Sequence, residues 1–149
     1  MISKHLLILP CSKRKKKVEN INALDLYDGP FYRILKNYNY HKIDIIIISA
    51  KYGLIKSNES ISYYDQRMTK ERAKEIAGET RSRLEAVLCS NKYESIFINL
   101  GKTYMLALDD SQDMLERYNA YYVRGRIGER LHQLKSWLCL IRSEEVLAS

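Results

Sequence analysis

Four short segments of the chain carry residue types that bind anions. They are residues 11–15, 50–54, 101–104 and 124–128. Each follows a run of apolar residues and contains a lysine or arginine, and three of them contain glycine. Cations and hydroxyl groups hold phosphate oxygens, and glycine lets the backbone approach a ligand closely. The alternative is that this composition only suits solvent-exposed turns. The candidate anion-binding residues are Ser12, Lys15, Lys51, Lys102 and Arg124, with the hydroxyl of Thr103 beside them.

Cys11 is a candidate nucleophile. It follows the apolar run that ends at Pro10 and precedes several lysines, whose charge favours the thiolate form. A cysteine at the end of a buried strand is also a common small core residue, and the sequence assigns no histidine to orient this one. Both interpretations stay open.

The segment Ser62-Tyr63-Tyr64-Asp65 joins two aromatic rings to a carboxylate in a predicted loop. Exposed aromatic rings stack on nucleobases, and an aspartate can act as a general base. The alternative is that a tyrosine anchors the loop against the sheet while Asp65 caps a turn. Tyr64 and Asp65 are therefore candidate ligand-facing residues.

The elements that position these residues alternate between strands and helices. Apolar and β-branched runs predict strands over 5–10, 43–49, 95–100 and 120–123. Helical spacing predicts a helix over 24–38 that is interrupted at Gly29 and Pro30, and a second helix after an N-cap at Thr69. It also predicts short helical pieces over 103–108 and 112–118 and a C-terminal helix from Ile127. This alternation predicts one α/β domain over 1–149, with three α/β/α layers and a central, mainly parallel four-stranded sheet. Ligands of such sheets bind at the carboxyl ends of the strands, where the four segments lie.

Composition limits the function classes. The 149 residues contain 25 Lys and Arg against 18 Asp and Glu, and this charge of +7 favours polyanionic partners. No apolar run reaches the roughly 20 residues of a membrane helix, and the N-terminus does not resemble a signal peptide, so we expect a cytoplasmic protein. Three cysteines and three histidines are scattered along the chain, which predicts neither a disulfide framework nor a structural metal. Without a Walker or Gly-x-Gly-x-x-Gly motif, no cofactor is expected.

Several motifs resemble those of known families. Pro10-Cys11-Ser12-x-x-Lys15, Ser49-Ala50-Lys51-Tyr52-Gly53-Leu54 and Tyr64-Asp65 are similar to motifs of small bacterial and archaeal domains labelled as YaaA-like peroxide-stress proteins. The resemblance covers about residues 5–68 well. The first motif also resembles a domain attached to archaeosine-forming enzymes, which act on 7-deazaguanine bases. Residues 27–31 and 98–103 look like segments of uracil-DNA glycosylases, although the catalytic Asp-Pro-Tyr and His-Pro-Ser signatures of those enzymes are missing.

These resemblances imply a uracil-DNA-glycosylase-like fold with a pocket for a nucleobase or nucleotide. The positions that match family motifs are Cys11, Ser12, Lys15, Lys51, Tyr52, Tyr64 and Asp65. We take Cys11, Asp65 and Lys51 as candidate catalytic residues. The candidate substrate-binding residues are Ser12, Lys15, Tyr52, Tyr64, Lys102 and Arg124.

Two functions are consistent with this set. The first is a protein directed at a nucleobase or nucleotide in nucleic-acid modification, repair or stress defence, with catalysis left open. The second is a non-catalytic DNA- or RNA-binding module that holds phosphates with the lysines of 13–17.

Overall fold

The structure is a computed structural model that describes residues 4–37 and 42–148, with side chains through residue 144. Its elements are, in chain order, β1 (Lys4–Pro10), β2 (Ile21–Asn22), α1 (Ala23–Leu26), α2 (Pro30–Leu35), β3 (Ile43–Ser49), β4 (Gly53–Lys56), β5 (Ser60–Ile61), α3 (Lys70–Cys89), β6 (Tyr93–Ile98), α4 (Lys102–Met105), the 3₁₀ helix η1 (Leu106–Ser111), α5 (Gln112–Leu115), β7 (Ala120–Tyr122) and α6 (Ile127–Ala148).

The central sheet has five strands in the order β4-β3-β1-β6-β7. β1 lies in the middle and pairs in parallel with β3 and β6, and β7 pairs in parallel with β6. β4 alone runs antiparallel, at the edge beside β3. β2 and β5 form a separate two-stranded antiparallel ribbon. The sheet is therefore mainly parallel, as the sequence predicts.

Burial explains why β1 and β3 take the central positions. Residues 5–10 of β1 and 45–49 of β3 are all buried, so both faces of these strands are covered. A strand covered on both faces reads as a continuous apolar run, and the five isoleucines of β3 add β-branched side chains that suit the pleated conformation.

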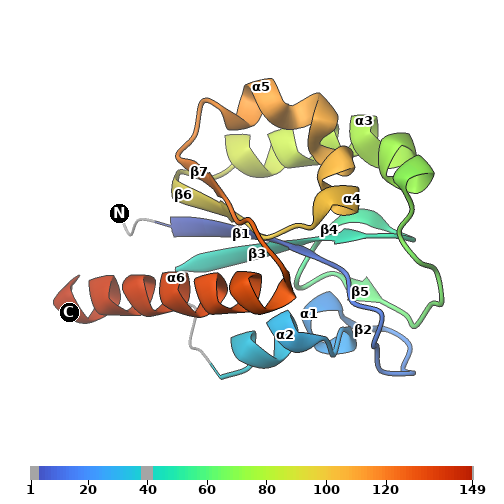
Figure 1. The fold of residues 1–149 in the computed structure, drawn as a ribbon, viewed down its shortest axis with the longest axis horizontal. Coiled ribbons are helices and arrows are strands. Elements are labelled where there is room, and N and C mark those ends of the chain that lie inside the picture. Colours follow the sequence, from blue (N-terminus) through green and yellow to red (C-terminus); the bar gives the residue numbers. More distant parts are fainter. Residues whose placement is uncertain (1–3, 38–41, 149) are drawn as a thin grey trace.

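Helices cover both faces of the sheet and complete three layers (Figure 1). α1, α2 and α6 lie on one face, and α3, α4, η1 and α5 lie on the other. α3 packs against η1 and β4, and α2 packs beside α6. No helix in the described part of the chain combines the length and apolarity needed to cross a membrane.

The expectation of four strands was wrong by one. β4 continues from β3 through a short turn, and Ser49 pairs with Gly53 across it. Gly53 has a φ of 75°, which lets the chain reverse at a position where a side chain would be strained. The motif that spans this turn is therefore a β-hairpin rather than an open loop after a strand.

The other expected elements are present with shifted ends. The interrupted helix over 24–38 is two helices, with Pro30 at the first position of α2, although residue 38 lies outside the described residues. The third strand begins two residues earlier than expected and ends at Ile98. The side chain of Thr69 accepts a hydrogen bond from the backbone N–H of Arg72, which confirms the N-cap of α3.

The chain leaves β1 and β6 toward opposite faces of the sheet. β1 continues to α1 and α2 on one face, whereas β6 continues to α4 and η1 on the other (Figure 1). Between adjacent parallel strands whose connections diverge in this way, a crevice opens at the carboxyl ends. The fold therefore predicts a crevice between the ends of β1 and β6.

The N-cap gives a test of the fold. Thr69→Ala removes the side-chain acceptor at the start of α3 and is expected to lower the free energy of unfolding by about 1 kcal/mol, measured by urea denaturation. Ser82→Ala, on an exposed interior position of the same helix, is the control and should change stability by less than about 0.5 kcal/mol. Equal losses in the two variants would contradict the capping role.

Candidate functional site

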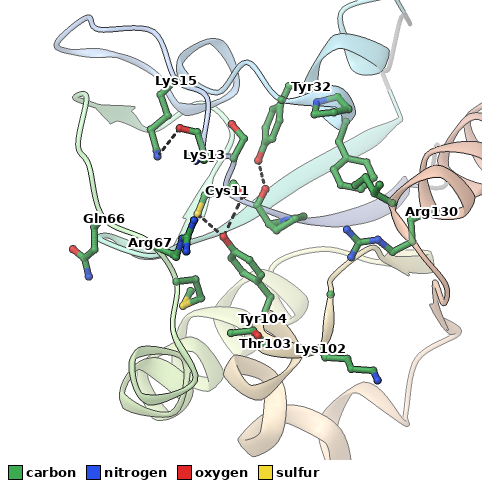
Figure 2. Close-up of a pocket in the computed structure, with 18 of the residues that line it drawn as sticks. Cys11, Lys13, Lys15, Tyr32, Gln66, Arg67, Lys102, Thr103, Tyr104 and Arg130 are labelled. Carbon is green, nitrogen blue, oxygen red and sulfur yellow. Dashed lines mark hydrogen bonds between the residues drawn. The ribbon is translucent and has the colours of Figure 1, made fainter.

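A pocket of about 620 Å³ lies at the carboxyl ends of β1 and β6 (Figure 2). Five separate stretches of the chain meet there: the segment after β1, the start of α2, residues 65–68 before α3, the segment after β6 and the first turns of α6. These stretches are brought together by the divergence of the connections from β1 and β6. The residues that line the pocket are Pro10, Cys11, Ser12, Lys13, Lys15, Gly29, Pro30, Phe31, Tyr32, Asp65, Gln66, Arg67, Met68, Gly101, Lys102, Thr103, Tyr104, Ile127 and Arg130.

Aromatic and apolar side chains form the inner walls of the pocket. Phe31 and Tyr32 come from the first turn of α2 and are buried, and Met68 faces them from the loop before α3. The hydroxyl of Tyr32 donates to the carbonyl of Pro10 at 2.6 Å, which fixes α2 against the end of β1. These walls suit a flat apolar ring.

Cations outnumber acids at the pocket. Lys13, Lys15, Arg67, Lys102 and Arg130 line it, whereas Asp65 supplies its single carboxylate among the described residues. Most of these cations are exposed at the rim, and the ammonium of Lys15 lies 4.5 Å from the centroid of the Tyr64 ring. The pocket therefore attracts anions.

Arg130 differs from the other cations because a buried nitrogen of its guanidinium lacks a partner. Its Nε is buried and has no hydrogen-bond partner, and no carboxylate in the described part of the chain pairs with its guanidinium. The guanidinium carbon lies 5.3 Å from the centroid of the Phe31 ring. Burial lowers the pKa of Arg130, but from so high a value that the group stays charged at neutral pH. Burying a hydrogen-bond donor without an acceptor costs free energy, so an acceptor placed beside Nε would stabilise this group.

The fold holds Arg130 in place from both sides. The side-chain amide of Asn99, just past β6, donates to the carbonyl of Arg130 at 3.3 Å and ties the first turn of α6 to the sheet. Gly101 passes so close that a Cβ on it would lie 3.0 Å from Nη1 of Arg130. Glycine at position 101 is thus what leaves room for the guanidinium.

Cys11 lines the pocket and contacts a tyrosine. Its thiol lies 3.0 Å from the hydroxyl of Tyr104, which also donates to the carbonyl of Cys11 at 3.3 Å. Burial and the neighbouring thiol raise the pKa of Tyr104 well above its usual range, so the phenol stays protonated and acts as a donor. No histidine is among the lining residues, so the structure pairs Cys11 with a phenol rather than with a base.

Tyr64 does not line the pocket but anchors the loop beside it. It is buried, and its hydroxyl is hydrogen-bonded to Tyr27 at 2.8 Å and to Ser49 at 2.9 Å. Burial raises its pKa well above the usual range. Every polar atom of this cluster is satisfied internally, which matches the anchoring role that the sequence left as an alternative.

The sequence-derived candidates therefore divide into two groups. Five of them line the pocket, namely Cys11, Ser12, Lys15, Asp65 and Lys102, and four do not, namely Tyr64, Lys51, Tyr52 and Arg124. Lys51 is exposed with its ammonium 5.2 Å from the centroid of the Tyr52 ring, and Tyr52 itself packs edge-on against Tyr64. Arg124 is exposed on the loop before α6.

Sequence reasoning missed Arg130, Arg67 and Tyr104. Arg130 had a visible signal, because it lies three residues after Ile127 and four before Leu134 on the apolar stripe of the C-terminal helix. A cation on the inward face of an amphipathic helix marks either an internal ion pair or a ligand. Arg67 and Tyr104 carry no such signal.

A possible metal-ligating group lies elsewhere. In residues 4–37 and 42–144, the His, Cys, Asp and Glu side chains that converge closely enough to hold an ion are His5, Glu94 and Glu144, at the opposite end of the sheet. The pocket itself contains one carboxylate and one thiol, which is too few for a metal site.

Comparisons with known proteins place the fold. Residues 6–136 match the model of a family described as of unknown function, DUF6884. The crystal structure of AF0587, a protein of unknown function, superposes with a TM-score of 0.58 at 15% sequence identity, over 91% of this chain and 44% of that one. The chain thus spans less than half of that neighbour, and the likeness concerns the fold alone. A comparison with curated proteins finds no match. The YaaA-like and glycosylase-like resemblances stay predictions.

The buried phenols predict a distinctive alkaline titration. Because burial raises the pKa values of Tyr27, Tyr32, Tyr64 and Tyr104 above that of a free phenol, their contribution to stability is complete below about pH 10 and is lost as pH rises further. Absorbance at 295 nm should show these phenols ionising only as circular dichroism reports unfolding.

Tyr64→Phe should remove one of these late-titrating phenols. Tyr63→Phe, at an exposed position outside the network, is the matched control and should leave the late phase unchanged. Ionisation of all 12 tyrosines near pH 10, with the protein still folded, would contradict the buried network.

Proposed function

The chain belongs to the DUF6884 family, and from that premise we propose that it binds a nucleotide, or a nucleobase within a nucleic acid, in the pocket between β1 and β6. The ligand joins a negatively charged group to a flat ring. Binding is the core of the proposal, and chemistry on the bound ligand is its extension.

The observation that carries this proposal is the partly buried guanidinium of Arg130, whose buried Nε has no hydrogen-bond partner, beside the ring of Phe31. A phosphate oxygen would supply the missing acceptor, and an arginine can present two parallel donors to it. Lys102, which also lines the pocket, adds a second charge. No internal partner offers the same compensation in the described part of the chain.

The dimensions and walls favour a ligand larger than a free phosphate. A volume of about 620 Å³ lies within the range of small-molecule sites, about 300–1,000 Å³. Phe31, Tyr32 and Met68 provide apolar surface that an inorganic anion does not need. A purine or pyrimidine ring would use that surface and leave its phosphate at Arg130.

The resemblances narrow the choice of ring. The likeness of the Pro10-Cys11-Ser12 motif to the archaeosine-associated domain favours a 7-deazaguanine-type base, and the YaaA-like likeness favours a role in nucleic-acid modification, repair or stress defence. These are inferences from sequence resemblance, and the pocket geometry is compatible with them.

Two lining residues could act on the bound ligand. Asp65 is exposed at the rim, and its carboxylate can accept a proton. The thiol of Cys11 can add to a ring C=N bond, so that a C–S bond forms and the π bond breaks. The ring nitrogen would take the proton of the Tyr104 hydroxyl, which would in turn take the thiol proton. Lys51 lies outside the pocket lining, so in this proposal it takes no part in the reaction.

A non-catalytic DNA- or RNA-binding module is the second candidate, and one observation favours it. Lys16 and Lys17 are exposed next to Lys13 and Arg14, on the same loop that forms one rim of the pocket. A polynucleotide whose base entered the pocket would pass its backbone along this loop.

The first test measures binding of guanosine monophosphate by isothermal titration calorimetry. We expect Arg130→Gln to weaken binding by roughly tenfold or more, because a hydrogen bond to a charged group contributes about 1.5–3 kcal/mol. Arg142→Gln is the matched control, since it removes an exposed arginine from the same helix outside the pocket, and it should change affinity less than about twofold.

Gly101→Ala provides a second variant, because the added Cβ would lie 3.0 Å from Nη1 of Arg130 and would crowd the guanidinium without removing its charge. It should also weaken binding. Equal affinities in Arg130→Gln and Arg142→Gln, or no binding of guanosine monophosphate, guanine, inorganic phosphate or an oligonucleotide, would refute the proposal.

The second test separates a free nucleotide from a polynucleotide. Fluorescence anisotropy of a labelled single-stranded oligonucleotide should show affinity that falls linearly with the logarithm of salt concentration. In a Lys16→Gln and Lys17→Gln double variant, the slope of log affinity against log salt concentration should become less steep by roughly 1 to 1.5 if both lysines contact phosphate. The control is Lys70→Gln with Lys74→Gln on α3, which should leave the slope unchanged. Identical slopes in all three proteins would exclude the loop as a polynucleotide contact.

A further inference from the structure

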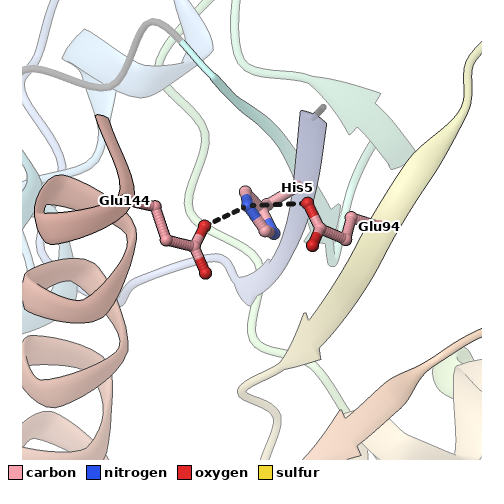
Figure 3. A group of neighbouring side chains, drawn as sticks. All are labelled: His5, Glu94 and Glu144. Atoms are coloured by element: carbon pink, nitrogen blue, oxygen red, sulfur yellow. Dashed lines mark ion pairs between the residues drawn. The ribbon is translucent and has the colours of Figure 1, made fainter. Parts of the chain in front are cut away.

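A second cluster of ligand-type side chains lies at the amino ends of β1 and β6, whereas the pocket lies at their carboxyl ends. Figure 3 shows its three side chains. Its members are His5 on β1, Glu94 on β6 and Glu144 near the C-terminal end of α6. They come from three elements that are adjacent only in the folded chain. This cluster plays no part in the proposed nucleotide site.

The donor atoms are close enough for one ion to contact all three. Nε2 of His5 lies 3.3 Å from a carboxylate oxygen of Glu144 and 3.9 Å from one of Glu94. All three donor atoms lie within 4.8 Å of one another. Zinc binds nitrogen and oxygen at about 2.0–2.2 Å, so tetrahedral ligands are separated by roughly 3.4 Å. The two glutamates are more than half exposed, so their side chains have room for the remaining adjustment.

His5 is held in the orientation that a metal ligand requires. Its side chain is only 5% exposed, and Nδ1 lies 2.6 Å from the hydroxyl of Ser95. The ring also packs edge-on against Trp137 at 6.0 Å. When Nδ1–H donates to the hydroxyl of Ser95, the lone pair of the neutral imidazole is on Nε2, which faces the two carboxylates. A hydrogen bond to the second ring nitrogen is the usual support of a histidine ligand.

The charges around the cluster are not balanced by other side chains. In the described part of the chain, no lysine or arginine forms an ion pair with Glu94 or Glu144, and the nearest strand lysine, Lys4, pairs with Asp44 instead. A protonated His5 would neutralise one of the two carboxylates. A divalent cation would neutralise both while His5 stays neutral.

We propose that His5, Glu94 and Glu144 bind a divalent transition-metal ion of the zinc class, with a water molecule as the fourth ligand. One nitrogen and two carboxylate oxygens match the ligand preferences of Zn²⁺. The ion joins the C-terminal end of α6 to β1 and β6, so its role is structural: it fastens the helix across the amino ends of the strands.

The test titrates Zn²⁺ into the protein, with no other ligand present, by isothermal titration calorimetry. One site per chain is expected in the wild type. Glu144→Gln and Glu94→Gln should each weaken it by about tenfold or more, because the amide keeps the shape of the side chain but removes the anionic ligand. Glu85→Gln, on an exposed position of α3 on the other face of the sheet, is the matched control and should leave affinity unchanged.

The fluorescence of Trp137 reports whether the ion binds at this cluster. It is the single tryptophan of the chain and packs against His5, so Co²⁺ bound at this cluster should quench its fluorescence in the wild type and in Glu85→Gln. Quenching should be lost in Glu144→Gln and Glu94→Gln. Zn²⁺ should also raise the melting temperature of the wild type and not that of these two variants.

Two results would overturn the proposal. Absence of Zn²⁺ binding to the wild type would mean that the cluster is only an ion pair between a protonated His5 and the glutamates. Binding that persists unchanged in both glutamine variants, with Trp137 unquenched, would place the ion at another site, such as the cysteine thiols. Circular dichroism of each variant confirms that it is folded before either conclusion is drawn.

Discussion

The structure depends on one constraint, namely that β1 is paired in parallel on both sides and covered on both faces. A strand in this position leaves its backbone hydrogen bonds no exposed edge, and its neighbours must be reached by crossovers that pass over the faces. The crossover to β3 and the continuation of β6 take opposite faces. Because the chain leaves β1 and β6 toward opposite faces, a space stays open at the carboxyl ends of these two strands. Side chains from five separate stretches line that space.

Two groups of buried polar atoms near that space differ in how their hydrogen bonds are satisfied. The hydroxyls of Tyr27, Ser49 and Tyr64 satisfy one another, so their burial stabilises the loop and requires nothing from outside. The guanidinium of Arg130 is also buried in part, yet its Nε has no internal acceptor. The first arrangement is that of an anchor. The second leaves a donor without an acceptor, which is the arrangement that an anionic ligand would complete.

α6 connects the two ends of the molecule. Its first turns carry Arg130 to the pocket, and its last turns carry Glu144 to the amino ends of the strands (Figure 1). A helix is stiff over this length, so whatever holds one end also limits the movement of the other. The contact of Asn99 with the carbonyl of Arg130 and the cluster around His5 are thus two attachments of the same rigid element to the sheet.

The sequence by itself determined the α/β class, the parallel core and the region of the pocket, because burial on both faces leaves continuous apolar runs and a cap such as Thr69 acts on its own turn. It also identified Cys11, Ser12, Lys15 and Lys102 as residues near strand ends, and Asp65 as a residue of a nearby loop. It did not reveal β4, since a hairpin turn at Gly53 and a loop share the same residue types. Only the tertiary structure decided that Arg130 enters the pocket while Lys51 and Arg124 stay outside it, and that His5 meets two glutamates. Those outcomes depend on how distant elements pack, and packing direction is not encoded by local spacing.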